Sequence, residues 1–222
     1  MILTRAIRKV LIDPFRYGFR DYDAERYWRD RYGKHRLALS GSGNEALTES
    51  ENLTQYEEDK ARIRALLLSA GVRLSPATRV LDVGCGNGQY TEMCRQAGVR
   101  SYEGVDITDS LFDSLGRQYP GYAFRKGDCT GPRLGHGFDC VLMIDVIEHI
   151  VNREKLLAAM ANARAALTPG GVFVVGPALR DSRKRMFYLH EWTETDIAAG
   201  FDVVARCPFK AGEMLALRTA VL

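Results

Sequence analysis

Short apolar runs alternate with segments of helical spacing from residue 79 to the end of the chain. The runs predict buried strands, and the spaced segments predict amphipathic helices. The strand-like runs are residues 79–83, 101–107, 122–128, 138–144 and 171–177. Alternation of this kind indicates βαβ units and a parallel sheet covered on both faces.

Two helices are predicted most clearly. Apolar side chains from Leu53 to Ala70 share one face of a helix that ends near Gly71, and residues 152–167 follow Asn152, an N-cap type, and stop at "PGG". A shorter helix is predicted at about residues 193–199. Two more strands follow, and the short connection "PFKAG" between them predicts antiparallel pairing. The whole is an α/β domain that ends in a β-hairpin.

Residues 1–52 differ from the rest and are predicted to form an N-terminal helical extension to a domain at 53–222. Residues 1–36 hold ten Lys/Arg and five Asp/Glu, a net +5 that leaves −2 for the remainder. Tyr22, Tyr27, Trp28 and Tyr32 suit either a lid over a ligand or ordinary packing. The first twelve residues suit a basic amphipathic helix, for which a lid or dimer contact competes with weak attachment to an anionic membrane surface.

Composition narrows the class of protein. The chain has 222 residues, of which 46% are hydrophobic and 27% charged, the values of a soluble globular protein with a full core. No run of about 18 apolar residues predicts a membrane-spanning helix. The five cysteines are scattered without a CxxC pair, which argues against a disulfide framework or zinc site and favours the reducing cytoplasm. A net charge of +3 does not by itself indicate a nucleic-acid partner.

The stretch "VLDVGCGNGQY", residues 80–90, predicts a ligand-binding turn after the first strand. Gly84, Gly86 and Gly88 let the backbone approach a ligand closely, but their spacing misses the dinucleotide pattern G-x-G-x-x-G. Asp82 would repel a pyrophosphate, by about 1 kcal/mol at 4 Å even in water. A ligand that carries an ammonium and a carboxylate but no phosphate, such as S-adenosylmethionine, removes that objection.

Two further acids follow the next strands. Asp106 ends the second strand, where a carboxylate can accept hydrogen bonds from ribose hydroxyls, and Asp128 ends the third, where it could accept from an adenine amino group. An ordered series of acids at three successive strand ends is more specific than the glycine turn alone.

Five segments resemble, in order, the motifs of class I S-adenosylmethionine-dependent methyltransferases: "VLDVGCGNGQYTEMC", "YEGVDITDSL", "FRKGDCT", "FDCVLMIDVIEHI" and "ALTPGGVFVVGPA". The resemblance covers about residues 53–222. It implies a Rossmann-like, seven-stranded, mostly parallel sheet with a C-terminal antiparallel hairpin, and S-adenosyl-L-methionine as cofactor. The cofactor-binding positions it implies are Asp82, Gly84, Cys85, Gly86, Asn87, Gly88, Asp106, Ile107, Asp128, Cys129, Ile144 and Asp145.

The segment "IDVIEHI" resembles the EH-containing motif of small-molecule members, among them the ubiquinone-pathway O-methyltransferases. Transfer to a hydroxyl needs help with proton removal, for which His149 is the leading base and Glu148 a further catalytic candidate. The alternative is that His149 only packs against the sheet or lines the cofactor pocket. Asp145 and Glu148 also fit an N-cap and capping box of the following helix.

A metal site is the alternative for the same segment. Asp145, Glu148 and His149 resemble the Glu-x-x-Glu-His site of small-RNA 3′-end 2′-O-methyltransferases, with Asp in place of the first Glu. Three such ligands suit Mg²⁺ or Mn²⁺. The leading interpretation assigns no metal.

The segment beyond the fifth strand carries the remaining candidates. His190, in "MFYLHEWT", is a second base candidate, and Trp192 is expected to border the acceptor. The run "RDSRKR" is either a solvated loop or, through Arg183 and Arg185, a site for an anionic group of the acceptor.

The predicted function is S-adenosylmethionine-dependent O-methylation of a small molecule such as a sugar, a nucleotide sugar or another metabolite, without a nucleic-acid partner. Three alternatives are metal-assisted 2′-O-methylation of RNA ends, NAD(P)-dependent oxidoreduction, and ligand binding by a methyltransferase-like protein without catalysis. The sequence predicts neither the acceptor nor the oligomeric state.

Overall fold

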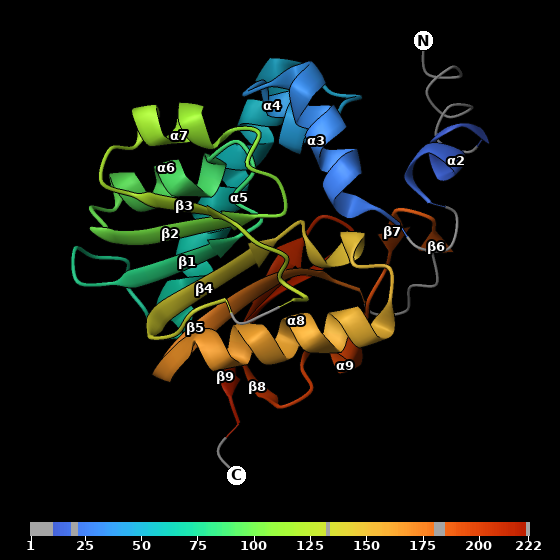
Figure 1. Cartoon of the computed structure of the whole chain (residues 1–222). Helices are drawn as coiled ribbons and strands as arrows, with labels where there is room; N and C mark the ends of the chain where they lie inside the picture. Colours follow the sequence, from blue (N-terminus) through green and yellow to red (C-terminus); the bar gives the residue numbers. More distant parts are fainter. Residues whose placement is uncertain (1–10, 19–21, 132–133, 180–184, 221–222) are drawn as a thin grey trace.

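A seven-stranded sheet in the order β3-β2-β1-β4-β5-β9-β8 forms the centre of the computed structural model, which describes residues 11–18, 22–131, 134–179 and 185–220 (Figure 1). β1 to β5 pair in parallel, and β9 runs antiparallel between β5 and β8. The predicted fold class and terminal hairpin are therefore confirmed. The strands are β1 Arg79–Val83, β2 Ser101–Asp106, β3 Ala123–Lys126, β4 Phe138–Ile144, β5 Leu167–Ala178, β8 Phe201–Phe209 and β9 Gly212–Thr219.

The sheet separates two hydrophobic layers. Along β4, Val141 and Met143 face the layer under α8 (Arg153–Ala166), whereas Cys140 and Leu142 face the layer under α5 (Glu49–Ser69) and α6 (Gln89–Gln96). Because successive residues of a strand point to opposite faces, a strand buried on both sides reads as a continuous apolar run. This is why the central strands were recognisable from sequence.

Capping residues set the starts of two helices. Asn152 Oδ1 accepts hydrogen bonds from the backbone N–H groups of Glu154 and Lys155 at 2.8 and 3.1 Å, which confirms the predicted cap of α8. α5 begins at Glu49, earlier than the predicted Leu53, because Thr48 and Glu51 form a reciprocal capping box. The predicted domain boundary at residues 52 and 53 therefore falls inside this helix.

The other elements are short. They are α2 Asp13–Tyr17, α3 Ala24–His35, α4 Leu39–Ser42, α7 Phe112–Gln118, the 3₁₀ turn η1 Ile147–His149, β6 Arg185–Met186, β7 Leu189–His190 and α9 Glu194–Ile197. α3 and α4 lie beyond the carboxyl ends of the parallel strands (Figure 1). There the Asn87 N–H donates to Ser42 Oγ at 3.1 Å and Lys126 pairs with Glu25 at 2.7 Å.

The amphipathic N-terminal helix predicted for residues 1–12 lies mostly outside the described residues. Of its apolar positions, Leu11 and Ile12 are described and are exposed. None of the helices in the described ranges is both long and apolar enough to cross a bilayer.

Asp82 is a buried acid inside the sheet. Its side chain is 1% exposed, and Oδ2 accepts a hydrogen bond from the Tyr102 hydroxyl at 2.7 Å. Tyr102 in turn lies 2.7 Å from Thr91 Oγ1. Burial raises the pKa of Asp82 to about 7, although the Tyr102 hydrogen bond opposes the rise.

We expect Asp82→Asn to flatten the fall in stability between pH 5 and pH 8. A carboxyl whose pKa is higher in the folded than in the unfolded protein stabilises the fold while protonated, and this contribution is lost as pH rises through the folded value. The wild type should therefore lose about 2–3 kcal/mol of unfolding free energy more than the variant over this range, at 1.36 kcal/mol per pKa unit. Urea denaturation at several pH values measures it.

The matched control is Asp202→Asn, which removes an exposed acid from β8. Its stability profile should run parallel to that of the wild type. Parallel profiles for the wild type and Asp82→Asn would contradict the expectation.

Candidate cofactor and acceptor site

A cavity of about 220 Å³ opens at the carboxyl ends of β1, β2 and β4, and α3 forms its outer wall. We call it the strand-end cavity. It lies where β1 separates β2 from β4, the point at which the strand order reverses and open α/β sheets bind ligands. The predicted cofactor residues in its lining are Gly84, Cys85, Gly86, Asn87, Asp106, Ile107, Asp128, Cys129, Ile144 and Asp145.

The glycine turn lies directly against the N-terminal wall. Gly86 has φ +51°, and a Cβ at this position would lie 2.7 Å from Ser42 Oγ. A side chain here would therefore displace α4. The Gly86 N–H instead donates to Asp106 Oδ2 at 3.0 Å, which joins the first turn to the end of β2.

Asp106 and Asp128 are held by local hydrogen bonds. Asp106 also accepts from the Thr108 N–H at 3.1 Å, and Asp128 Oδ1 accepts from the Thr130 N–H and hydroxyl, both at 2.8 Å. Burial raises the pKa of Asp106 to about 6, against the lowering effect of its backbone hydrogen bonds. Each carboxylate oxygen can accept a further hydrogen bond, as the predicted ribose and adenine contacts require.

Two predicted cofactor residues are absent from the lining that the structure describes. The Asp82 carboxylate accepts a hydrogen bond from the Tyr102 hydroxyl and lies outside the cavity lining. The structure therefore does not fit the predicted contact between Asp82 and the cofactor. Alternation along β1 accounts for this, since its neighbours Val83 and Leu81 face the opposite layer. Gly88 is the N-cap residue of α6, with φ +83°, and lies outside the cavity lining.

A second cavity of about 230 Å³ adjoins the first, and we call it the side cavity. Its lining is polar: Trp28, Arg31, Ser42, Gly43, Asn44, Asn52, Gln55, Tyr56, Asp59, Asp145, Glu148, His149 and Lys210. Five of these residues also line the strand-end cavity: Trp28, Ser42, Tyr56, Asp145 and His149. A ligand in the side cavity would therefore lie next to one in the strand-end cavity.

Residues 145–149 form a 3₁₀ turn instead of the predicted start of a helix. Asp145 has φ +59°, its N–H donates to the Gly176 carbonyl at 2.9 Å, and its carboxylate pairs with Lys210 at 2.5 Å. The turn's N-cap position is Val146, which has no capping side chain. The predicted cap at Asp145 and capping box at Glu148 are therefore wrong, because the Asp145 carboxylate is committed to Lys210.

His149 stands at the junction of the two cavities. Its Nδ1 lies 3.0 Å from the Tyr188 carbonyl oxygen. A carbonyl only accepts hydrogen bonds, so Nδ1 carries the hydrogen and the neutral ring has its lone pair on Nε2. The edge of the Trp28 ring packs against the imidazole at a centroid distance of 5.1 Å.

Two candidates from the segment after β5 lie outside both cavities. His190 is 8% exposed and its ring stacks on that of Trp192 at a centroid distance of 3.9 Å. Because neither residue lines a cavity, the structure does not fit the predicted role of His190 as a base or of Trp192 beside the acceptor. Trp192 Nε1 instead donates to the Ile147 and Ile150 carbonyls at 3.1 and 2.9 Å. It thereby anchors the turn that carries His149.

The predicted anion site and the alternative metal site have different outcomes. Arg183 lies outside the described residues, and of Arg185 only the backbone, in β6, is described. Within the described part of the chain, no three His, Cys, Asp or Glu side chains are arranged to hold a metal ion. Asp145, Glu148 and His149 therefore do not assemble the alternative metal site.

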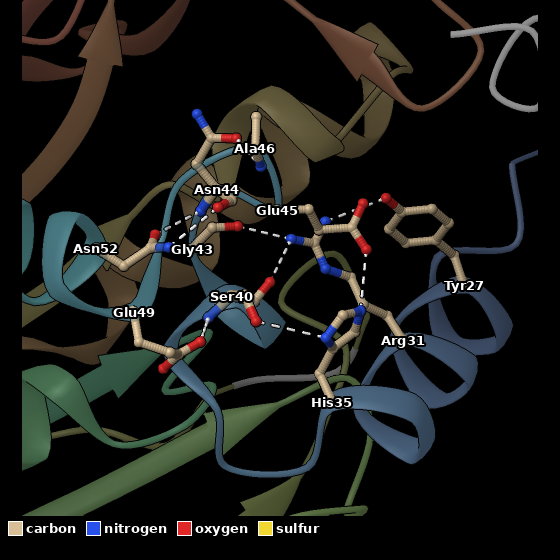
Figure 2. Close-up of polar contacts among 10 residues, drawn as sticks. All are labelled: Tyr27, Arg31, His35, Ser40, Gly43, Asn44, Glu45, Ala46, Glu49 and Asn52. Atoms are coloured by element: carbon tan, nitrogen blue, oxygen red, sulfur yellow. Dashed lines mark hydrogen bonds and ion pairs between the residues drawn. The ribbon is translucent and has the colours of Figure 1, made fainter. Parts of the chain in front are cut away.

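The loop that walls both cavities is fixed by partly buried polar contacts (Figure 2). Arg31 Nη2 donates to the Ser40 and Gly43 carbonyls at 3.0 and 2.6 Å, and His35 Nε2 lies 3.1 Å from Glu45 Oε1. Sequence reasoning did not identify Ser42, Tyr56, Tyr90 or Lys210 as lining residues. Of the aromatic residues proposed for a lid, Tyr22, Trp28 and Tyr32 line the strand-end cavity, whereas Tyr27 packs in an aromatic cluster.

Comparison with known proteins agrees with this geometry. A family model described as "Methyltransferase domain" matches residues 54–212. The chain is 31% identical over 130 residues to the 18S rRNA (guanine(1575)-N(7))-methyltransferase of Saccharomyces cerevisiae, covering 54% of this chain and 46% of the relative. It is 31% identical over 107 residues to the dTDP-3-amino-3,4,6-trideoxy-alpha-D-glucopyranose N,N-dimethyltransferase of Streptomyces venezuelae, covering 47% and 44%.

The chain spans about half the length of these curated relatives. Its fold also resembles that of magnesium protoporphyrin IX methyltransferase from Synechocystis, with a TM-score of 0.63 and 19% identity over 90% of this chain and 99% of the other. The family match, the strand order and the acids at the strand ends agree. The chain belongs to the methyltransferase-domain family, within the class I S-adenosylmethionine-dependent methyltransferases.

Proposed function

We propose that this chain transfers the methyl group of S-adenosylmethionine to a hydroxyl of a polar, sugar-like small molecule, with His149 as the base. The observation that supports this most directly is the position of His149. It lines both cavities, and its contact with the Tyr188 carbonyl leaves Nε2 as the proton-accepting nitrogen. The cofactor would occupy the strand-end cavity and the acceptor the side cavity.

The strand-end cavity fits the cofactor through its glycine turn and its two strand-end acids. Gly86 lines the cavity and ties the turn to Asp106, and Asp106 and Asp128 are held in place as hydrogen-bond acceptors. When bound, S-adenosylmethionine supplies an electrophilic methyl group. The chain would align the acceptor oxygen with this methyl group and exclude water from the site. As the C–O bond forms and the C–S bond breaks, the hydroxyl proton passes to His149 Nε2, and S-adenosylhomocysteine leaves.

The polar lining of the side cavity supports a hydrogen-bonding acceptor of low apolar content. The amides of Asn44 and Gln55 and the Tyr56 hydroxyl provide donors and acceptors, and Trp28 adds an aromatic surface. The Streptomyces relative is named for an amino-sugar nucleotide, which agrees with a sugar-like acceptor but favours nitrogen as the methylated atom. An amine nucleophile is therefore the second candidate.

The yeast relative is named for RNA, so the comparisons do not support the prediction that nucleic acid is no partner.

We expect Asp106→Ala to weaken S-adenosylhomocysteine binding by at least about tenfold. Each lost hydrogen bond to a carboxylate is worth about 1.5–3 kcal/mol, and the same change frees the glycine turn from its Gly86 contact. Isothermal titration calorimetry of the full chain measures the affinity. Asp113→Ala, which removes an exposed acid from α7, is the control and should bind like the wild type. Binding of NAD⁺ in place of S-adenosylhomocysteine would favour the oxidoreductase alternative.

We expect His149→Gln to lower kcat by about 10²–10⁴-fold, the usual contribution of a general base, with a much smaller change in S-adenosylhomocysteine affinity. Release of S-adenosylhomocysteine with a panel of methyl glycosides and nucleotide sugars provides the assay. The wild-type rate should rise with pH over the range in which imidazole loses its proton, and the rate of the variant should not. An unchanged kcat and pH profile in His149→Gln would rule out its role as the base.

A further inference from the structure

Three buried side-chain atoms of residues that line the side cavity make no hydrogen bond to any described residue. They are Glu148 Oε2, Arg31 Nε and Asp145 Oδ1, of which Asp145 Oδ1 is ion-paired with Lys210. Buried polar atoms in native proteins are nearly always hydrogen-bonded, because an unpaired one costs about 1–3 kcal/mol. Because the residues that carry them line a cavity, a ligand bound there can provide the missing partners once their side chains turn toward it.

Glu148 differs from the other two acids of the side cavity. Asp145 pairs with Lys210 at 2.5 Å, and Asp59 accepts from Arg62 at 3.0 Å. Glu148 is half-buried, yet Oε2 itself is inaccessible to solvent and lacks a hydrogen-bond donor among the described residues. Arg31 has already committed both Nη atoms, to the Ser40 and Gly43 carbonyls and to the Tyr27 hydroxyl. Glu148 is therefore the acid with an open position for a ligand donor.

The Asp145–Lys210 pair is held in place at a conformational cost. Asp145 has φ +59° and Lys210 has φ +52°, two of the three non-glycine residues with positive φ among those described. The left-handed conformation costs roughly 1–2 kcal/mol for such residues, and strain of this kind concentrates at functional sites. Lys210 comes from the turn between β8 and β9, where it also lies 5.2 Å from the Phe209 ring centroid. Because Lys210 balances Asp145, the Glu148 charge is left for the acceptor.

We propose that the side cavity is an amine subsite, in which the Glu148 carboxylate binds a protonated amino group of the acceptor. This rests on the proposed function, since the side cavity is taken as the acceptor site. When Glu148 is ionised beside a bound ammonium, the lining carries three acidic charges (Asp59, Asp145 and Glu148) against two basic ones (Arg31 and Lys210), which favours a cation. The protonated amine lies next to the reacting hydroxyl. An amine that is itself the nucleophile would first have to give its proton to His149 Nε2 to free its lone pair. Glu148 is thus a specificity-determining residue.

The surroundings of Glu148 give this subsite a measurable property. Burial and the nearby Asp145 raise the pKa of Glu148 to about 8, which Lys210 partly opposes. Asp59, Arg31, His149 and Tyr56 are the other titratable groups in the lining. At pH 7 Glu148 is therefore mostly protonated in the free protein, and a bound ammonium favours its ionised form. Amine binding should release a proton to the buffer.

The experiment uses the full chain saturated with S-adenosylhomocysteine. The probes are methyl glucosides in which the 2-, 3- or 4-hydroxyl is replaced by an amino group, with methyl glucoside as the neutral match and methyl glucuronide as the anionic match. We expect at least one amino probe to bind about tenfold or more tightly than methyl glucoside, equivalent to about 1.4 kcal/mol. Calorimetry in buffers of different ionisation enthalpy should show proton release on binding.

The variants separate recognition from folding. Glu148→Gln should lose both the preference for the amino probe and the proton release, whereas Glu148→Asp should keep part of the preference. Glu154→Gln makes the same chemical change at an exposed position of α8 and should bind the probes like the wild type. Thermal melting shows which variants are folded. If Glu148→Gln does not fold, the test is the comparison of Glu148→Asp with Glu154→Gln.

Three results would overturn the amine subsite. They are equal or tighter binding of the neutral or anionic probe, a preference that survives Glu148→Gln, and failure of every amino probe to bind at its solubility limit. Failure of the proposed function would look different. In that case S-adenosylhomocysteine itself would not bind, whereas a wrong subsite assignment would leave its binding intact.

Discussion

Parallel pairing of β1, β2 and β4 is the constraint on which the site depends. Parallel neighbours end at the same edge of the sheet, so the glycine turn after β1, Asp106 after β2 and Asp145 after β4 meet although they are separated in sequence. The Gly86–Asp106 hydrogen bond joins the turn after β1 to the end of β2. Asp145, after β4, is instead paired with Lys210, which lies outside the parallel strands in the turn between β8 and β9. The reversed strand β9 therefore contributes to the site as well as to the sheet.

The N-terminal segment completes the cavities through contacts that depend on its own internal order. Arg31 holds the loop between α3 and α5 by two carbonyls, and Asn52 holds it from α5 through the Asn44 backbone (Figure 2). A loop fixed in this way presents Ser42 to the glycine turn at hydrogen-bond distance. Polar contacts thus hold the outer wall of the site in place. The predicted domain boundary between residues 52 and 53 falls within this wall.

The sequence predicted best what depends on local pattern and least what depends on long-range packing. β1 and β4 have the predicted bounds because a strand buried on both faces is a continuous apolar run. The alternative assignment of Asp145 as a helix N-cap was wrong because its partner, Lys210, is 65 positions away in a turn with no recognisable motif. His190 and Trp192 were misassigned because aromatic residues suit a pocket wall and a core equally well, and here they stack on one another. Asp82 was predicted to bind the cofactor, but its carboxylate accepts a hydrogen bond from Tyr102 and lies outside the strand-end cavity.

The acids of the two cavities differ in how far the protein itself satisfies them. Asp106 and Asp128 in the strand-end cavity accept hydrogen bonds from backbone N–H groups close by in the fold, so their orientation is set before any ligand arrives. Such preorganisation lowers the cost of binding a ligand that does not vary. Glu148 has no equivalent support at Oε2, and its neighbour Asp145 is satisfied only by a residue from the hairpin turn. The strand-end cavity is therefore built from the common sheet framework, and the side cavity from the connections around it. Differences in acceptor between proteins of this fold are expected to follow from those connections, here the α3–α5 loop and the β8–β9 turn.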